Sequence, residues 1–222
     1  MTQKTVDLPK FGRAAEVRSA SFSEADNTIE VVWTTGAPVR RYSYREGVNY
    51  VETLEVSKEA VRLERLNAGA PFLNTHSDSN LSDVIGSVVP GSARIEGGKG
   101  VATIRLSSAA EDAGIVGKIR DGVIRNISVG YSIHKVERSV TSDGSDEEWL
   151  VVDWEPMEIS AVPVPADAGS QIRSGGKTQP CQIVDRRSNA EVRESMIRRQ
   201  RYSSIAGKLV RLERRIERFE EL

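Results

Sequence analysis

The sequence of 222 residues has very little cysteine and histidine. Its one cysteine, Cys181, cannot form a disulfide within the chain, so nothing in the sequence indicates an oxidising compartment. We therefore expect a reducing cytoplasm. The two histidines are His76 and His134. Catalysis that uses a histidine as general base must use one of these two.

Long apolar runs and an excess of one charge are also missing. The N-terminal segment MTQKTVDLPKFGRAAEV lacks the apolar core of a secretion signal, and no later segment approaches the roughly 20 apolar residues that span a bilayer. Lys and Arg total 31 against 32 Asp and Glu, and the net charge of -1 gives no overall attraction to nucleic acid or an anionic membrane. The sequence thus predicts a soluble protein with no membrane and no nucleic acid as partner.

The length allows one domain of ordinary size with an appendage. We predict an N-terminal tail at 1–13, a main domain at 14–168, a flexible linker at 169–190 and a C-terminal amphipathic helix at 191–222. The helix prediction rests on apolar residues spaced three and four apart, namely Tyr202, Ile205, Leu209, Leu212, Ile216 and Phe219. Such a helix is marginal alone in water, so we expect it to pack on a partner chain or on the main domain.

Strand signals dominate the main domain. They predict strands at 16–22, 28–34, 84–89, 93–96, 101–106, 126–136 and 149–152, and Gly97-Gly98 is a predicted hairpin turn. Helical signals predict short helices at 57–67 and 109–120. The three prolines of WEPMEISAVPVPADAG favour an edge or terminal strand over a central one. The predicted fold class is mostly β with flanking helices, an α+β arrangement.

The stretch NISVGYSIHKV, at 126–136, alternates apolar with small or polar residues and therefore predicts a half-buried strand. Its two faces would carry Ile127, Val129, Tyr131 and Ile133 on the core side and Ser128, Gly130, Ser132 and His134 on the other. Six residues of strand separate Ser128 from His134 by about 20 Å, whereas a nucleophile and its base must approach to about 3 Å. A catalytic serine here needs a histidine from elsewhere in the chain.

His76 lies in the polar loop of APFLNTHSDSN, where a histidine is often only a surface residue. A metal site of His76 with Asp78 and Asp83 is disfavoured, because no second His or Cys lies near, and we expect neither metal nor cofactor. Glu158 lies in the apolar strand MEISAVPVP, where its carboxylate needs a polar partner. An imidazole could donate a hydrogen bond to this carboxylate, as the histidine does in a Ser-His-acid arrangement. Glu155 is the alternative acid.

Three motifs in the order FLNTH, NISVGY and MEISAVPVPAD resemble the prohead maturation proteases of tailed bacteriophages, serine peptidases related in fold to the herpesvirus assemblins. The resemblance covers about residues 14–168. It implies that His76 is the general base, Ser128 the nucleophile and Glu158 the acidic member. It also implies a small, mostly antiparallel β-barrel flanked by helices.

The resemblance further implies a serine endopeptidase that cleaves the major capsid protein and its scaffold segment, and usually itself. The work would be done in the host cytoplasm, inside the assembling procapsid. The C-terminal helix is then expected to be scaffold-like or capsid-targeting and to support self-association, and the linker at 169–190 is a candidate place for self-cleavage. The rival interpretation is a non-enzymatic capsid-associated or scaffold-associated β-domain that assembles through that helix.

Two details of the expected site stay open from the sequence. The oxyanion needs preorganised donors, and backbone amides near Arg125 or Gly130 are candidates. Gly130, two residues beyond Ser128 on the same face, either leaves room for a substrate backbone or marks a bulge.

Overall fold

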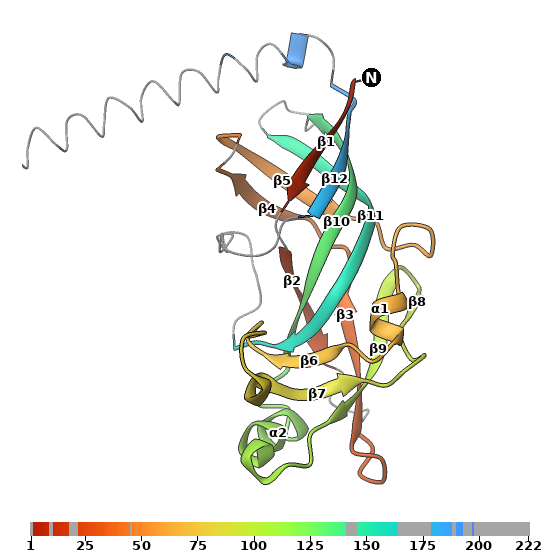
Figure 1. Ribbon diagram of the computed structural model, residues 1–222, viewed down its shortest axis with the longest axis vertical. Coiled ribbons are helices and arrows are strands. Elements are labelled where there is room, and N and C mark those ends of the chain that lie inside the picture. The colour runs from red at the N-terminus through yellow and green to blue at the C-terminus, as the bar shows by residue number, and fades with distance from the viewer. Residues whose placement is uncertain are drawn as a thin grey trace, which may run out of the picture.

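The computed structural model describes residues 2–8, 11–17, 22–44, 46–140, 146–163, 179–187, 190–192 and 197. Within them, one mixed sheet holds twelve strands (Figure 1). Their bounds are β1 Thr2–Leu8, β2 Phe11–Val17, β3 Thr28–Thr34, β4 Val39–Ser43, β5 Val48–Leu54, β6 Pro71–Asn74, β7 Val84–Val88, β8 Arg94–Glu96, β9 Lys99–Leu106, β10 Asn126–Val140, β11 Glu147–Ala161 and β12 Gln179–Asp185. The helical elements of these residues are short: α1 Glu64–Asn67, η2 Leu81–Asp83, η3 Ala110–Asp112 and α2 Ala113–Arg120. The predicted mostly β class is therefore confirmed.

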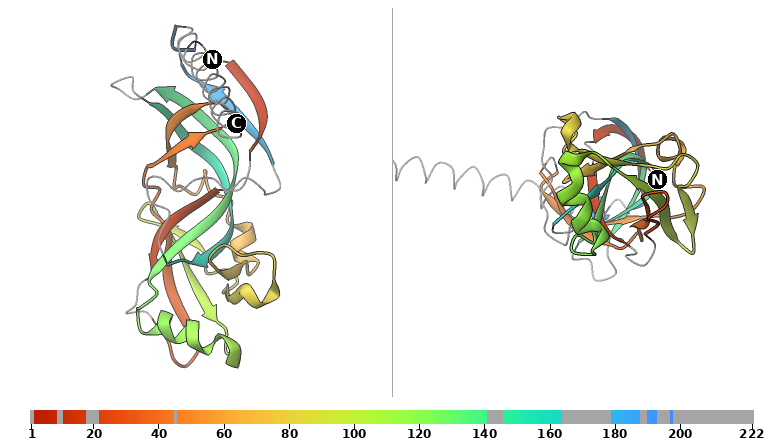
Figure 2. Two further views of the ribbon diagram at one scale, coloured as in Figure 1. Left: turned by 90° about the vertical axis from the view of Figure 1, so that its left-hand side faces the viewer. Right: turned by 90° about the horizontal axis from the view of Figure 1, so that it is seen from below.

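The strand order is β1-β12-β10-β2-β3-β9-β7-β6-β11-β5-β4, and β8 pairs with β9 beside this path. Strand β11 also pairs with β10, so these two strands are neighbours although they stand apart in the order. Most pairs are antiparallel, but β10 runs parallel to β12, and β11 runs parallel to β5 and to β6. The sheet is thus mixed but mostly antiparallel, and the expected mostly antiparallel pairing is met. Figure 2 shows how β10 and β11 cross the length of the molecule.

The long strand β10 continues the predicted alternation of NISVGYSIHKV. Its apolar residues are buried, with exposures of at most 1% at Ile127, Val129, Tyr131 and Ile133. Tyr131 contacts the Trp154 ring edge to face at 5.5 Å between centroids, in the arrangement that aromatic pairs prefer. The core face of this strand was therefore predicted correctly.

The stretch WEPMEISA, at 154–161, lies in a central strand rather than at an edge, which corrects the prediction from the prolines of this segment. It forms part of β11, which pairs with β10 along one side and with β5 and β6 along the other. The β5 contact covers Glu147–Val151 and the β6 contact covers Ile159–Ala161. Pro156 lies between these two contacts, so its missing N–H removes no bond to either strand.

The predicted helix at 57–67 is confirmed only for its last turn, α1. The preceding residues bond to β11 instead: Arg62 N donates to the Trp154 carbonyl at 2.9 Å, and Trp154 N donates to the Ala60 carbonyl at 2.9 Å. Backbone groups used in these bonds are not available for helical i to i-4 bonds. The predicted helix at 109–120 corresponds to η3 and α2, and Gly97-Gly98 forms the β8–β9 turn.

Two segments predicted as tail and linker contain strands. The segment at 1–13 holds β1 and the start of β2, and the segment at 169–190 holds β12. Strand β12 pairs with β1 on one side and with β10 on the other, and its residues Cys181 and Ile183 are fully buried. Burial raises the pKa of the Cys181 thiol to about 12. Residues 179–185 therefore form a strand of the sheet within the segment predicted as a linker. Most of the predicted C-terminal helix lies outside the described residues.

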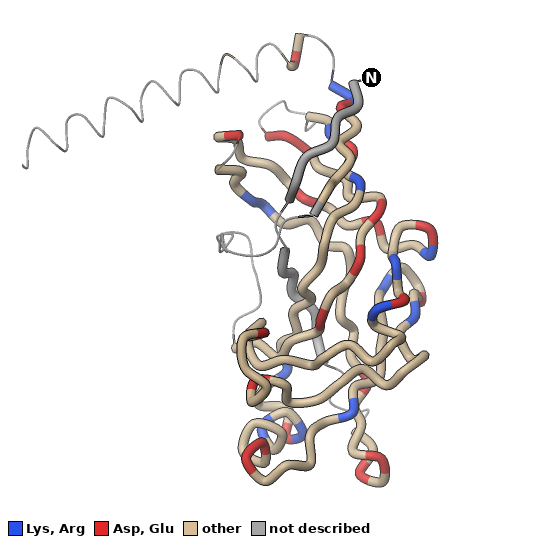
Figure 3. The backbone as a smooth tube through the Cα atoms, viewed as in Figure 1, with Lys and Arg blue, Asp and Glu red and all other residues tan. Residues whose placement is uncertain are grey.

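Charges of both signs are interspersed along the described part of the chain (Figure 3). This distribution agrees with the net charge of -1. No helix among the described residues is long and apolar enough to cross a membrane.

We predict that Ile183→Ala lowers the free energy of unfolding by about 2–4 kcal/mol, because it removes a buried side chain from the sheet. Urea denaturation measures the change. The matched control is Gln182→Ala, on the neighbouring and less buried position of β12, which should cost under about 1 kcal/mol. Equal unfolding midpoints for the two variants would mean that residues 179–185 do not pack as a strand.

Candidate active site

Ser128 lies near the start of β10, on the face opposite to the buried apolar residues. It stands opposite Ser160 of β11 on one side and opposite Ala14 of β2 on the other. The residue is 1% exposed. Because strands hold it on both sides, its hydroxyl has a fixed position relative to β11.

His76 follows β6 in a tight turn. The residues Thr75 and His76 both have positive φ, at 54° and 61°, a conformation that is strained for residues other than glycine. Three backbone or side-chain bonds hold this turn: Thr75 N donates to the Ala161 carbonyl, Ser77 N donates to the Asn74 carbonyl, and His76 N donates to Ser160 Oγ. The turn is thereby attached to the end of β11.

The structure brings Ser128, His76 and Glu158 together. The distance from His76 Nε2 to Ser128 Oγ is 2.7 Å, and the distance from His76 Nδ1 to Glu158 Oε1 is 2.6 Å. Both distances lie within hydrogen-bond range. The tautomer with the proton on Nδ1 donates to the carboxylate and leaves the Nε2 lone pair facing the serine hydroxyl. This order of contacts is the one in which a histidine can take a proton from a serine.

Glu158 is 8% exposed and lies opposite Gly130 in the β10–β11 register. A Cβ atom at Gly130 would stand 2.1 Å from Glu158 Oε1, which is closer than any real contact. The glycine therefore makes space for the carboxylate, a role that neither sequence interpretation of Gly130 included. The register also shifts between Gly130 and Tyr131, so the predicted bulge lies beside this glycine.

Ser160 is a site residue that the sequence reasoning missed. Its hydroxyl donates to Glu158 Oε2 at 2.5 Å and accepts the bond from His76 N at 3.2 Å. It is fully buried. The available signal was its parity, since Ser160 lies two residues beyond Glu158 and thus on the same face of the strand.

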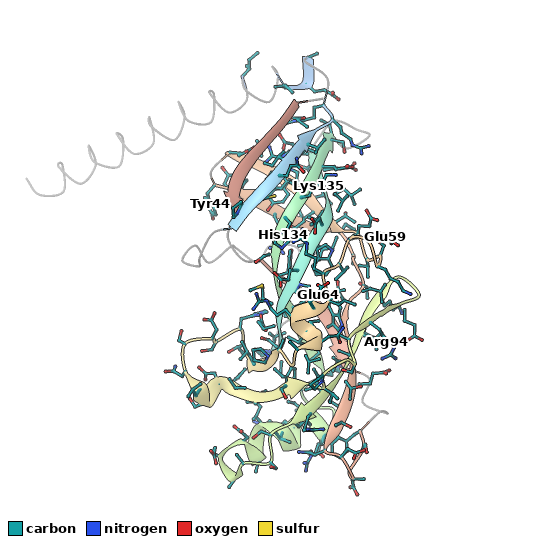
Figure 4. The ribbon with its side chains drawn as sticks, turned by 45° about the vertical axis from the view of Figure 1, so that its right-hand side comes forward. Tyr44, Glu59, Glu64, Arg94, His134 and Lys135 are labelled. Carbon is teal, nitrogen blue, oxygen red and sulfur yellow. The ribbon has the colours of Figure 1, made fainter. Side chains whose placement is uncertain are left out.

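The alternative acid, Glu155, lies in a different cluster. Its Oε1 accepts a bond from Arg65 Nε at 3.1 Å, and its Oε2 lies 3.7 Å from His134 Nε2. Figure 4 shows His134 farther along β10, with Glu64 on the nearby helix α1. The acid beside His76 is therefore Glu158, and His134 is not brought to Ser128, as the strand geometry predicted.

In the loop beyond His76, Asp83 makes local contacts. Ser77 Oγ donates to Asp83 Oδ2, and Asn80 Nδ2 donates to the same oxygen at 3.4 Å. Within the described ranges, no group of three or more His, Cys, Asp or Glu side chains is arranged to hold a metal ion.

A buried charge cluster supports β10 on its core side, behind the site. Tyr131 donates its hydroxyl proton to Glu52, and Arg41 bonds both the Glu52 carboxylate, at 3.0 Å, and the Tyr131 hydroxyl, at 3.1 Å. Burial alone would lower the pKa of Arg41, but the Glu52 carboxylate together with Tyr131 and Tyr50 outweighs this effect and holds the pKa of Arg41 above its ordinary value. The cluster connects β4 and β5 to the strand that carries Ser128.

Comparisons with known proteins agree with the three sequence motifs. A family model described as Caudovirus prohead serine protease matches residues 52–182, which include Ser128, His76 and Glu158. A protein named Major capsid protein, from Halomonas phage phiHAP-1, is 32% identical over 117 residues, which make up 53% of this chain and 19% of that protein. The chain thus corresponds to about a fifth of that relative's length. No solved structure matched the chain.

We predict that Gly130→Ala separates His76 from Glu158, because the added methyl group occupies the position of Glu158 Oε1. The measurement is the ¹⁵N spectrum of the imidazole rings, of which the protein has two, and the fraction of His76 with its proton on Nδ1 should fall. The control is Gly117→Ala, in α2, where an added Cβ meets nothing within 4 Å. An unchanged His76 signal in folded Gly130→Ala would contradict the assigned contact.

Proposed function

Because this chain belongs to the caudovirus prohead serine protease family, we propose that it is a serine endopeptidase of capsid maturation with Ser128 as nucleophile. His76 is the proposed general base and Glu158 the acid that orients it. The observation that carries the proposal is the pair of hydrogen bonds through the two nitrogens of His76, to Ser128 Oγ and to Glu158 Oε1.

In the first step, Ser128 Oγ attacks the carbonyl carbon of a peptide bond while His76 Nε2 accepts the hydroxyl proton. The new positive charge on the imidazole ring is stabilised by Glu158, whose oxygen lies 2.6 Å from Nδ1. Glu158 keeps its own negative charge and holds the ring in the tautomer that can accept the proton. The two hydrogen bonds of His76, to Ser128 Oγ and to Glu158 Oε1, support this proton transfer.

In the second step, His76 gives the proton from Nε2 to the leaving amine, and the C–N bond breaks. The acyl group remains on Ser128 as an ester. A water molecule then attacks this ester while Nε2 accepts its proton, which releases the carboxylate product and restores the serine hydroxyl. The same nitrogen acts first as base and then as acid, so its fixed distance of 2.7 Å from Ser128 Oγ matters in both steps.

The placement of the three side chains favours this chemistry over a purely structural role, in which buried polar side chains would only hydrogen-bond one another. They come from β10, from the turn after β6 and from β11, which are distant in the sequence. A buried glutamate could be satisfied by any donor, but here the imidazole joins it to a serine through the opposite ring nitrogen. The strained backbone at Thr75 and His76 is of the kind that gathers at functional sites.

Backbone amides near Arg125 are the proposed donors that bind the oxyanion. Gly130, the other candidate, stands opposite Gly12 of β2 and Glu158 of β11, within ladders on both sides. Backbone groups used in a ladder cannot also bind an oxyanion. Arg125 comes directly before β10, outside these ladders.

The proposed substrates are the major capsid protein and its scaffold segment, and the proposed place of action is the assembling procapsid in the host cytoplasm. Two findings support these substrates. The chain is a member of a prohead protease family, and a homologous segment forms part of a longer protein named Major capsid protein. Self-cleavage, self-association and the small, mostly antiparallel β-barrel of the family are part of the same proposal.

The name of that relative also favours a second candidate, a capsid-associated β-domain without enzymatic activity. Such a domain would not need Ser128. The two candidates therefore differ in the effect of removing a single hydroxyl group.

We predict that Ser128→Ala abolishes cleavage when the chain is expressed together with its cognate capsid protein. Loss of the nucleophile should lower the rate by about 10⁴-fold or more, since without it the acyl-enzyme cannot form. Intact masses of both proteins provide the readout, and urea denaturation checks that the variant folds. Shortened products with wild type alone support the peptidase. Identical products from wild type and folded Ser128→Ala would favour the non-enzymatic candidate.

We predict that Glu158→Gln slows the same cleavage by about 10²- to 10⁴-fold, because an amide no longer stabilises the charged imidazole ring. The matched control is Glu155→Gln, three residues earlier on the same strand, whose carboxylate contacts Arg65. It should cleave within about twofold of wild type. If the two variants are equally slow, Glu158 has no special part in the reaction.

A further inference from the structure

We propose that Ser160 is a positioning residue for the peptidase reaction, because one hydroxyl group connects the acid, Glu158, with the backbone of the base, His76. This inference rests on the proposed function. It assigns to Ser160 a task that Ser128, His76 and Glu158 do not perform. Ser160 fixes the position of the Glu158 carboxylate relative to the turn that carries His76.

The direction of the two hydrogen bonds follows from the chemistry of the groups. A hydroxyl has one proton to donate and two lone pairs that accept. The backbone N–H of His76 can only donate, so Ser160 Oγ accepts from it at 3.2 Å. The proton of Ser160 is then free to be given to Glu158 Oε2, which lies at 2.5 Å. Both capacities of the hydroxyl are used within the site.

The carboxylate of Glu158 is fixed at both oxygens as a result. Oε1 faces His76 Nδ1, and Oε2 faces the Ser160 hydroxyl. Among the side chains that the structure describes, Ser160 is the one hydrogen-bond donor to Oε2. Without it, the carboxylate could rotate about its last bond, and its alignment with the imidazole ring would be lost.

The second bond acts on the turn that carries the base. His76 has a φ of 61°, a conformation that persists in a residue other than glycine only where its surroundings hold it. The neighbouring bond from Thr75 N to the Ala161 carbonyl fixes one side of this turn to β11, and the bond from His76 N to Ser160 Oγ fixes the next residue. Ser160 therefore helps to set the position of the ring through the backbone as well as through Glu158.

A nearby serine shows that burial alone does not produce such contacts. Ser132 is 2% exposed, on the same face of the sheet, and its hydroxyl has no hydrogen-bond partner among the described residues. Ser160 is equally buried but makes two bonds, both to groups of the proposed site. Ser132 is thus a matched control: its loss removes a buried hydroxyl without touching His76 or Glu158.

The test is the rate at which a fluorophosphonate reagent labels Ser128 in the full chain, followed by intact mass. This reaction reports the activation of the nucleophile without a protein substrate. We expect Ser160→Ala to label about ten- to a hundredfold more slowly than wild type, the rate equivalent of one charge-assisted hydrogen bond. Ser132→Ala should match wild type, Ser160→Thr should recover most of the rate because it keeps a hydroxyl, and Ser128→Ala should not label.

The outcomes separate this inference from the proposed function. If wild type does not label at Ser128, the proposed function fails and the role of Ser160 fails with it. If wild type labels and folded Ser160→Ala labels as fast, or if Ser132→Ala is equally slow, the role of Ser160 alone is overturned. Should Ser160→Ala not fold, Ser160→Cys takes its place, since a thiol of similar size is only a weak donor. A wild-type rate in Ser160→Cys would also overturn the inference.

The ¹⁵N spectrum of the imidazole rings adds a second readout. A general loss of stability would change the signals of both histidines, whereas a positioning role of Ser160 affects His76 alone. We expect Ser160→Ala to reduce the fraction of His76 protonated on Nδ1 while the signal of His134 stays in place. His134 lies on the same strand as Ser128, beside Glu155, and reports whether the sheet is intact. Equal changes in both rings would indicate a structural effect and overturn the positioning role.

Discussion

The candidate site depends on the pairing of β10 with β11. Their register puts Ser128 opposite Ser160 and Gly130 opposite Glu158, so Ser128, Glu158 and Ser160 lie on one face. Because side chains alternate along a strand, a slip of one residue would turn Glu158 toward the core, among the apolar residues. The parallel contact of β6 with the end of β11 then brings the turn of His76 to the same place. The residues of the site come from three separate segments, and the register of β10 with β11 brings them together.

The arrangement has a cost in stability that the surrounding contacts must offset. A buried carboxylate is unfavourable unless donors replace its water, and Glu158 has two, the imidazole of His76 and the hydroxyl of Ser160. The positive φ values at Thr75 and His76 cost on the order of 1 kcal/mol each. Gly130 contributes by lacking a side chain, since any Cβ would displace the carboxylate. The sheet therefore holds the three side chains in a fixed arrangement, as the proposed proton transfer requires.

Local patterns predicted the features that depend on one strand at a time. The alternation around Ser128 gave the correct core face, and the length of six strand residues correctly excluded His134 as its partner. The same patterns failed where distant segments decide the structure. Pro156 lies in a central strand because its position falls between two neighbours of β11, and residues 179–185 form a strand because β1 and β10 flank them. Neither relation can be read from the segment itself.

The choice between Glu158 and Glu155 illustrates this limit at the site. Both are glutamates of one strand, three residues apart, and each could satisfy a histidine. The sequence favoured Glu158 for its place in an apolar strand and by resemblance to a family. The structure separates the two by contacts: Glu158 faces His76, and Glu155 faces Arg65 and His134. Glu158 and Ser160 share one face of β11, and Ser160 bonds both the acid and the turn of the base. A different glutamate would need a different register, and with it a different partner for the backbone of His76. The contact of Glu158 with His76 and the position of the His76 turn are thus consequences of the same pairing.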